Sequence, residues 1–360
     1  MERFSCKTRI LAGTGALQEL KNLSCHRVLV VADPYFAQNG IAQKVAALTG
    51  AEKTEIFAKV QPDPSVQLAA EGTALVQKMQ PDTVIALGGG SAMDCAKAMI
   101  YFAGGNISLV AIPTTSGSGS EVTDFAILTH GATKHPLVDE KLRPTVAILD
   151  SDLLQELPAK IIADTGFDVL CHALEALVAT GAGAITDALA RDAFATVYNA
   201  LPVSFLGKQS VRQSIHTAAA MAGMAFTQAG LGLCHAMAHS LGGMFHVPHG
   251  RLNAILLPEV VRVNATVAGS KYATLARSAG LGGSADTVAV RNLCNGLLQL
   301  RKTLQLPSTL QQAGVDPRQV RLQTEEIVAA ALSDPCCKTN PVSVDSATVR
   351  HVLTQVTGHG

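Results

Sequence analysis

The stretch VIALGGGSAMDCAK, residues 84–97, decides the fold class of the N-terminal half of the chain. An apolar run that is typical of a buried strand leads directly into a glycine turn and then into a helix start. The three glycines are Gly88, Gly89 and Gly90. Ser91 is a candidate helix N-cap, with Asp94 three residues later in the spacing of a capping box. Glycines let a ligand approach the backbone, and a helix start favours a phosphate group, although a plain tight turn explains the same residues.

Three further apolar runs in the first 150 residues carry the same signal. The four expected strands are residues 27–33 (RVLVVAD), 83–87 (TVIAL), 108–112 (SLVAI) and 146–150 (VAILD). Helix-like segments separate them, which is typical of βαβ units in a parallel sheet. We therefore expect a Rossmann-like α/β domain over residues 1–150, although the glycine turn does not follow the usual GxGxxG fingerprint.

A second polar loop and an acidic residue also follow expected strands. Residues 113–121, PTTSGSGSE, offer five hydroxyl side chains and two glycines. Open α/β sheets bind nucleotides at such loops, at the carboxyl ends of parallel strands. Asp33 stands where a carboxylate can accept hydrogen bonds from an adenosine ribose and repel a 2′-phosphate. The alternatives are a solvated loop and, for Asp33, a cap or turn before Pro34.

The chain becomes helical after about residue 151. The helix-periodic segments are residues 160–180, 184–201, 209–228, 232–244 and 286–304. We expect an all-helical domain over residues 151–360, with the boundary near Asp150–Pro158. Because no Gly/Ser linker separates the halves, we expect them to pack tightly and to form a cleft.

Histidines and one aspartate form the second chemical signal. Asp168 and His172 stand at i and i+4, so a helix places them on one face. Four of the chain's 11 histidines fall within 15 residues: His235, His239, His246 and His249. Their neighbours are small or apolar, and an unpaired polar group buried there would be costly. Carboxylate and imidazole donors suit Zn²⁺ or Fe²⁺, whereas the adjacent Cys171 and Cys234 point elsewhere on their helices and are expected to be core thiols.

The composition excludes several classes of partner. Lys+Arg and Asp+Glu both count 28, and there is no Trp, so we expect neither nucleic acid nor an anionic membrane as a partner. Eight cysteines are scattered without a CxxC pair, which indicates reduced thiols in the cytosol. The N-terminus lacks the apolar region of a secretory signal, and no apolar run reaches the length of a membrane span. We expect a soluble, cytoplasmic protein.

Four segments together carry a resemblance to a known family. GGGSAMDCAK, AIPTTSGSGSEVT, TGFDVLCHALEA and GLGLCHAMAHSLGGMFHVPHG, in this order and spacing, resemble the iron-containing (group III) alcohol dehydrogenases. The resemblance extends over essentially the whole chain, including Thr339–Pro341, and implies a dehydroquinate synthase-like fold. The compact length and the FHVPHG ending are closest to members that serve propanediol or ethanolamine utilisation in bacterial microcompartments. It further implies a homo-oligomer, expected to be a dimer, with the enzymes or shell of a microcompartment as candidate partners.

The resemblance also implies the roles of individual residues. The implied metal ligands are Asp168, His172, His235 and His249, holding Fe²⁺, with Zn²⁺ open because it uses the same donors. His239 matches a histidine near the substrate and is the expected catalytic proton relay. The implied NAD-binding residues are Asp33, Gly88, Gly89, Gly90, Ser91, Asp94, Thr114, Thr115, Ser118 and Lys134. Asp63 stands where relatives often carry Asn, and His246 receives no metal role.

The expected function is that of an NAD(H)-dependent, metal-dependent alcohol dehydrogenase. Its substrates would be short-chain primary alcohols and aldehydes, such as 1-propanol with propionaldehyde or ethanol with acetaldehyde, and aldehyde reduction would regenerate NAD⁺. One alternative is a zinc-dependent glycerol or polyol dehydrogenase. The other is a catalytically silent scaffold protein, against which the complete set of expected ligands argues.

Overall fold

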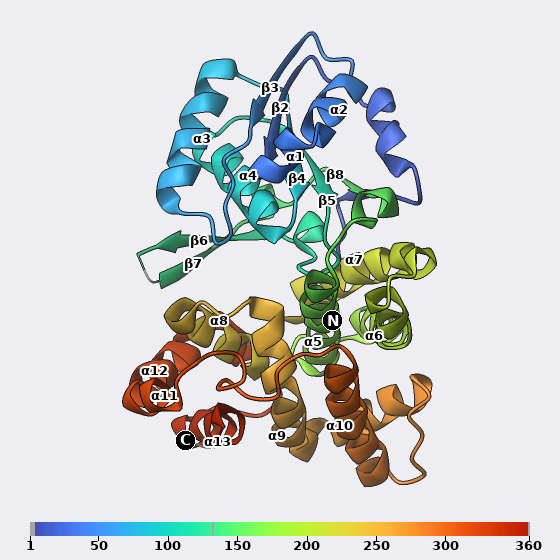
Figure 1. The fold of residues 1–360 in the computed structure, drawn as a ribbon, viewed down its shortest axis with the longest axis vertical. Helices are drawn as coiled ribbons and strands as arrows, with labels where there is room; N and C mark the ends of the chain where they lie inside the picture. The colour runs from blue at the N-terminus through green and yellow to red at the C-terminus, as the bar shows by residue number, and fades with distance from the viewer. Residues whose placement is uncertain (1–3, 132, 359–360) are drawn as a thin grey trace. The chain divides into compact units, whose positions relative to one another are not determined.

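The computed structural model describes residues 4–131 and 133–358, and the chain divides into two compact units. One unit comprises Ser5–Leu157, and the other begins at Pro158. The first is built on a parallel sheet and the second on helices (Figure 1). The expected fold class, an α/β part followed by a helical part, is therefore confirmed.

Six parallel strands form the sheet of the first unit, in the order β1-β8-β5-β4-β2-β3. Their bounds are β1 Arg9–Ala12, β2 Arg27–Ala32, β3 Lys53–Phe57, β4 Thr83–Gly88, β5 Ser108–Pro113 and β8 Val146–Leu149. The four strands expected from the sequence are the four inner ones. The edge strands β1 and β3 were not expected, because β1 has only four residues and β3 reads KTEIF, with little apolar character.

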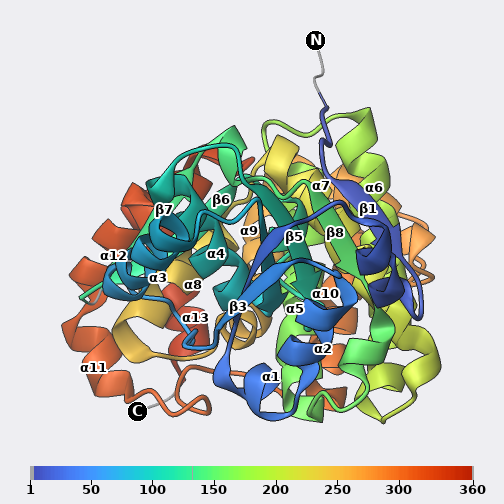
Figure 2. The same ribbon diagram turned by 90° about the horizontal axis from the view of Figure 1, so that it is seen from above.

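Helices cover both faces of this sheet. They are α1 Pro34–Gln38, α2 Ile41–Leu48, α3 Val66–Met79 and α4 Gly90–Ala103. Because alternate residues of a strand point to opposite faces, β2 contributes to two cores. Val28 and Val30 pack with α1 and α2, whereas Leu29 and Val31 pack with α3 and α4. Figure 2 shows the two helix pairs on opposite sides of the strands.

A β-hairpin, which the sequence analysis did not anticipate, follows the second polar loop. Strands β6 (Phe125–His130) and β7 (Thr133–Val138) pair antiparallel as a separate two-stranded sheet. Ser65 and Thr129 form an isolated parallel bridge, which joins the hairpin to the start of α3. The hairpin matters for the site because it carries Lys134.

The start of α4 corrects one expectation. Ser91 is not the N-cap, because the helix begins at Gly90 and its N-cap is Gly89, with no side-chain cap. Asp94 forms no capping box and instead accepts a hydrogen bond from the Ser120 hydroxyl at 3.0 Å. Glycine at the cap keeps the first turn of α4 clear of side chains, which is the arrangement that suits a phosphate at a helix start.

The elements of the second unit are all helices, joined by loops, over its described residues. Its main helices are α5 Ala159–Val178, α6 Ala184–Phe205, α7 Arg212–Ala229, α8 Leu233–Phe245, α9 His249–Ser278, α10 Asp286–Thr303, α11 Pro317–Leu322, α12 Thr324–Ser333 and α13 Ser346–Thr357. Five of them, α5, α6, α7, α8 and α10, were expected from the sequence, whereas α9, the longest, and the C-terminal α11, α12 and α13 were not. Pro258 lies inside α9 and Ala268 has non-helical backbone angles, so the local signals contradict one another there.

The described residues also bear on the state of the cysteines and on membrane-spanning helices. The eight cysteines are all free, and Cys171 and Cys234 are fully buried, as expected of thiols in the core. No helix in residues 4–131 or 133–358 is both long enough and apolar enough for a membrane crossing.

Candidate metal centre and cofactor loops

Three imidazoles of the second unit converge on one carboxylate oxygen. Asp168 Oδ1 lies 3.5 Å from His249 Nε2, 3.8 Å from His235 Nε2 and 3.9 Å from His172 Nε2. Ligands about 2.1 Å from a tetrahedral ion lie about 3.4 Å from one another, so these separations suit a metal site that contracts slightly on binding. The donors therefore fit Zn²⁺ or Fe²⁺ by type. The ligand atoms of Asp168, His172 and His235 also lie within 4.8 Å of one another, whereas His249 approaches this group at Asp168 Oδ1.

Three helices bring these donors together. Asp168 and His172 lie one turn apart on α5, His235 lies in the first turn of α8, and His249 is the first residue of α9. Gly250 permits the close approach of α9 to α5, because a Cβ there would collide with the backbone oxygen of Asp164. The side chain of His249 is 31% exposed and that of His235 only 2%, so the centre opens to solvent on the His249 side.

A buried glutamate, Glu175, holds His235 in place. Its Oε2 lies 2.6 Å from His235 Nδ1, and its two oxygens also accept the backbone N–H groups of Gly232 and Cys234 at 3.0 and 2.7 Å. Carboxylate contacts of this kind fix the ring orientation of a metal-binding histidine. Burial raises the pKa of Glu175 to about 7, against the opposing effect of its backbone hydrogen bonds. Burial also lowers the pKa of His235 well below the ordinary value, which favours the neutral ring that binds a metal.

Asn253, one turn after His249 on α9, is a further member of the centre. Its amide Nδ2 donates to Asp168 Oδ1 at 2.7 Å and lies 3.2 Å from His249 Nε2. The side chain is completely buried. Asn253 therefore fixes the orientation of the Asp168 carboxylate. Neither Asn253 nor Glu175 was expected from the sequence, where the only signal was helical spacing, of i+4 from His249 and i+3 from His172.

His239 lies beside this centre and has a different partner. Its Nδ1 is 2.8 Å from Asp334 Oδ2, and its ring stacks on that of His249 with centroids 5.2 Å apart. Burial would raise the pKa of Asp334, but the hydrogen bond from His239 and the backbone N–H of Cys336 lower it to about 2. An ionised carboxylate thus holds the His239 ring. His246, by contrast, is exposed at the end of α8 in the left-handed conformation.

The two polar loops of the first unit touch each other. A Cβ at Gly89 would lie 3.2 Å from Thr115 Oγ1, and one at Gly90 would lie 3.1 Å from Ser118 Cβ. The backbone N–H of Thr114 donates to Gly88 O at 2.9 Å. The structure therefore brings the glycine turn and the hydroxyl loop into one surface at the carboxyl ends of β4 and β5, where a larger residue would be tightly packed against the hydroxyl loop.

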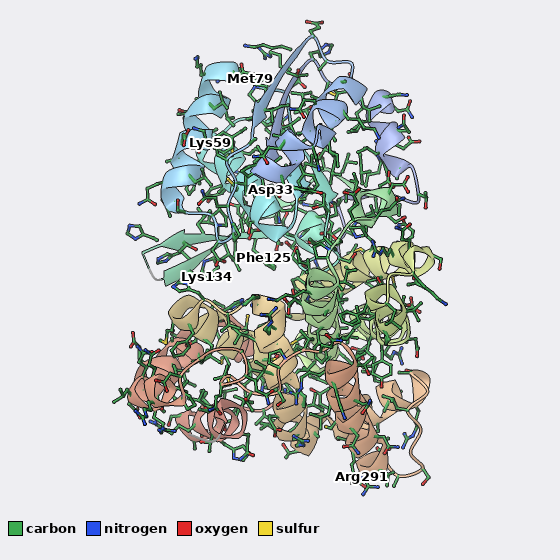
Figure 3. All side chains as sticks on the ribbon, in the orientation of Figure 1. Asp33, Lys59, Met79, Phe125, Lys134 and Arg291 are labelled. Carbon is green, nitrogen blue, oxygen red and sulfur yellow. The ribbon has the colours of Figure 1, made fainter. Side chains whose placement is uncertain are left out.

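Asp33 and Lys134 lie on different elements of this unit (Figure 3). Asp33 caps α1, because its Oδ1 accepts the N–H groups of Tyr35 and Phe36 at 2.9 and 3.3 Å. Its Oδ2 lies 3.7 Å from the position of a Cβ at Gly88, so the carboxylate also borders the glycine turn. Lys134 forms an ion pair with Asp63 at 2.6 Å.

A buried lysine, Lys97, holds the end of the hydroxyl loop, residues 113–121, by hydrogen bonds. Its Nζ donates to Ser120 Oγ at 3.0 Å, to both oxygens of Thr123 at 3.0 and 3.1 Å, and to Phe125 O at 2.8 Å. Burial lowers the pKa of Lys97 to about 8 and raises that of Asp94 to about 6. The only sequence signal for this role was a lysine among the small and apolar residues of CAKAM, residues 95–99.

Comparisons with known proteins bear on both units. Residues 7–151 match the profile of the family described as iron-containing alcohol dehydrogenase, and residues 162–357 match that of the C-terminal part of the Fe-containing alcohol dehydrogenase family. The 1-propanol dehydrogenase PduQ of Salmonella typhimurium is 39% identical, over 99% of this chain and 100% of the relative. The NADPH-dependent butanol dehydrogenase of Clostridium saccharobutylicum is 35% identical, over 98% of this chain and 97% of the relative.

A solved structure agrees with this likeness. The iron-containing alcohol dehydrogenase of Thermococcus thioreducens superposes with a TM-score of 0.92 at 32% identity, over 98% of this chain and 99% of that one. Family profiles covering both units, relatives matched over their whole length and the same fold all point in one direction. The chain belongs to the iron-containing alcohol dehydrogenase family and is an oxidoreductase that interconverts alcohols and aldehydes.

Proposed function

We propose that this enzyme reduces a short-chain aldehyde to a primary alcohol with NADH, at a centre held by Asp168, His172, His235 and His249. The observation that carries the proposal is the convergence of three imidazole Nε2 atoms on one carboxylate oxygen. In this proposal residues 1–150 bind the dinucleotide, and residues 151–360 bind the metal and the substrate.

The chain's own residues prepare the reaction at this centre. When bound, Fe²⁺ supplies a Lewis acid for the substrate oxygen, and the nicotinamide exchanges the hydride. Glu175 and Asn253 hold His235 and Asp168 in the orientation that the metal needs. His239 has Nδ1 engaged by Asp334, so its Nε2 is the nitrogen that delivers a proton to the substrate oxygen or removes one.

The cofactor site would use the touching loops of the first unit. The uncapped start of α4, with Gly89, Gly90 and Ser91, receives the pyrophosphate, and Thr114, Thr115 and Ser118 add hydroxyl donors. Gly88 and Asp94 complete this surface. Asp33 keeps one carboxylate oxygen at the glycine turn, where it repels a 2′-phosphate and favours NAD(H). Lys134, now paired with Asp63, is assigned to the nicotinamide ribose.

The substrate assignment rests on the relatives. One is named a 1-propanol dehydrogenase and another a butanol dehydrogenase, so we propose propionaldehyde or acetaldehyde as substrate, with regeneration of NAD⁺. These relatives do not favour a zinc-dependent polyol dehydrogenase. We further propose a cytoplasmic dimer that works beside the enzymes or shell of a microcompartment, on the likeness to PduQ.

Anaerobic loading tests the proposal. The metal-free protein is reconstituted with Fe²⁺ or with Zn²⁺, and oxidation of NADH and NADPH is followed with propionaldehyde, while oxidation of glycerol is followed with NAD⁺. We expect iron-dependent reduction of propionaldehyde with NADH, and loss of that activity in air because ferrous iron reacts with O₂. Faster glycerol oxidation with zinc, or equal use of NADPH, would contradict the proposal.

A further inference from the structure

A second group of donor atoms lies next to the proposed centre and differs from it in chemistry. One nitrogen of His239, one carboxylate oxygen of Asp334 and the sulfur of Cys336 all lie within 4.8 Å of one another. The side chains of His239 and Asp334 are 22% and 15% exposed, and Cys336 is also partly exposed, so an ion can reach the group. The proposed iron centre, by contrast, has only nitrogen and oxygen donors.

The backbone holds this group ready. Asp334 caps the short 3₁₀ helix Pro335–Thr339, and its Oδ1 accepts the N–H of Cys336 at 2.8 Å. This turn brings the cysteine back to the carboxylate, while the other carboxylate oxygen faces His239 Nδ1 at 2.8 Å. The three donors are therefore placed by a local turn and one helix, α8, within a single unit of the chain.

The neighbouring cysteine takes no part in this group. Cys337 Sγ donates to the carbonyl oxygen of Ala331 at 3.0 Å. Among the described residues, the groups of donors that include Cys336 do not include Cys337. The chain thus offers two adjacent, partly exposed thiols, of which one belongs to the donor group and the other serves as its control.

We infer that His239, Asp334 and Cys336 form a second metal site, which binds zinc and inhibits the enzyme. Imidazole, carboxylate and thiolate are the donors of zinc sites, and a thiolate favours zinc over iron. With three protein ligands and a water molecule, the ion is bound reversibly. Binding releases the Cys336 thiol proton to solvent, a neutral His239 ring carries its one proton on Nε2 instead of Nδ1, and no oxidation state changes.

Inhibition follows from the place of His239 in the reaction, so this part rests on the proposed function. A zinc ion on Nδ1 replaces the hydrogen bond between His239 and Asp334. The ring then carries its one proton on Nε2 and can no longer change between the protonated and neutral forms that the proposed proton transfer needs. We therefore expect zinc to lower the turnover rate without displacing the ion at Asp168.

Zinc titration of the iron-loaded enzyme tests the effect on activity. We expect activity to fall as one further zinc ion binds, with the bound iron unchanged, and to return on brief treatment with a chelator and no added iron. Cys336→Ser keeps the backbone N–H that donates a hydrogen bond to Asp334. Because it removes the thiolate ligand, it should raise the half-inhibitory zinc concentration at least about tenfold. Cys337→Ser should behave like the wild type. Equal inhibition of both variants, or release of iron as activity falls, would overturn the inference.

Cobalt spectroscopy tests the site without any reference to catalysis. Co²⁺ bound to a thiolate produces a charge-transfer band in the near ultraviolet, and we expect it in the wild type and in Cys337→Ser but not in Cys336→Ser. Cys171, Glu175 and His235 form another group of donors, and a band that survives in Cys336→Ser would assign the ion there and refute the proposed site. If the protein shows this band but has no dehydrogenase activity, the metal site is supported and the proposed function is refuted. The band without zinc inhibition would refute the role of the site in regulation.

Discussion

Replacement of Glu175 by glutamine should weaken metal binding. Glu175 is not one of the proposed metal ligands, but it contacts one of them, His235. Both oxygens of the carboxylate accept hydrogen bonds: Oε1 from the N–H of Cys234, and Oε2 from the N–H of Gly232 and from His235 Nδ1. A glutamine has only one acceptor oxygen. Whichever way it is placed, its NH₂ group meets a buried N–H that can only donate.

The magnitude follows from this mismatch. One buried N–H without an acceptor costs about 1–3 kcal/mol, which should appear in the metal-free protein. Loss of the carboxylate that orients a metal-binding histidine weakens metal affinity about 10- to 100-fold. At a fixed excess of metal, this loss reduces the stabilisation that binding provides by about 1.4–2.7 kcal/mol.

Denaturant unfolding with and without metal separates the two effects, and competition with a coloured chelator gives the affinity directly. Glu326→Gln, at an exposed position of α12, is the control and should change neither quantity. If Glu175→Gln is less stable without metal yet binds zinc and iron as the wild type does, the carboxylate has only a packing role and our account of His235 is wrong.

Four shorter predictions concern the other side chains. Asp168→Ala and His249→Ala should lose metal and activity while keeping the circular dichroism of the wild type; a fully metallated, active variant would remove the ligand assignment. His239→Ala should retain its metal but lose rate, with one ionisation missing from its pH–rate profile; metal content measured beside that profile decides the matter. Asp33→Gly should narrow the preference for NADH over NADPH, as the ratio of the two kcat/KM values would show. Burial raises the pKa of Glu121 from 4.5 to about 7, so folding takes up a proton between these pH values and the free energy of unfolding falls as the pH rises through 7. Glu121→Gln should reduce this fall by up to about 3 kcal/mol, measured by urea unfolding at pH 5 and at pH 8.

Local patterns were enough to predict part of this protein. The strand–glycine–helix stretch at residues 84–97 predicted a parallel sheet, because strand and helix periods differ and glycines mark the turn between them. Asp168 and His172 could be paired because i and i+4 residues share a helix face whatever the rest of the fold does. The motifs also carried the family resemblance, and with it the role expected of each histidine.

Only the tertiary structure showed which distant groups meet. Glu175 contacts a backbone segment 57 to 60 residues away, and Asp334 contacts His239 across 95 residues, so no spacing along the chain indicated either pair. Ser91 looked like a helix cap by residue type, yet the helix begins one residue earlier and Asp94 bonds instead to a loop residue, Ser120. Side-chain periodicity is a property of one element, whereas hydrogen-bond partners depend on how elements pack. The sequence by itself therefore determined the kinds of donor present, and packing decided which of them share a site.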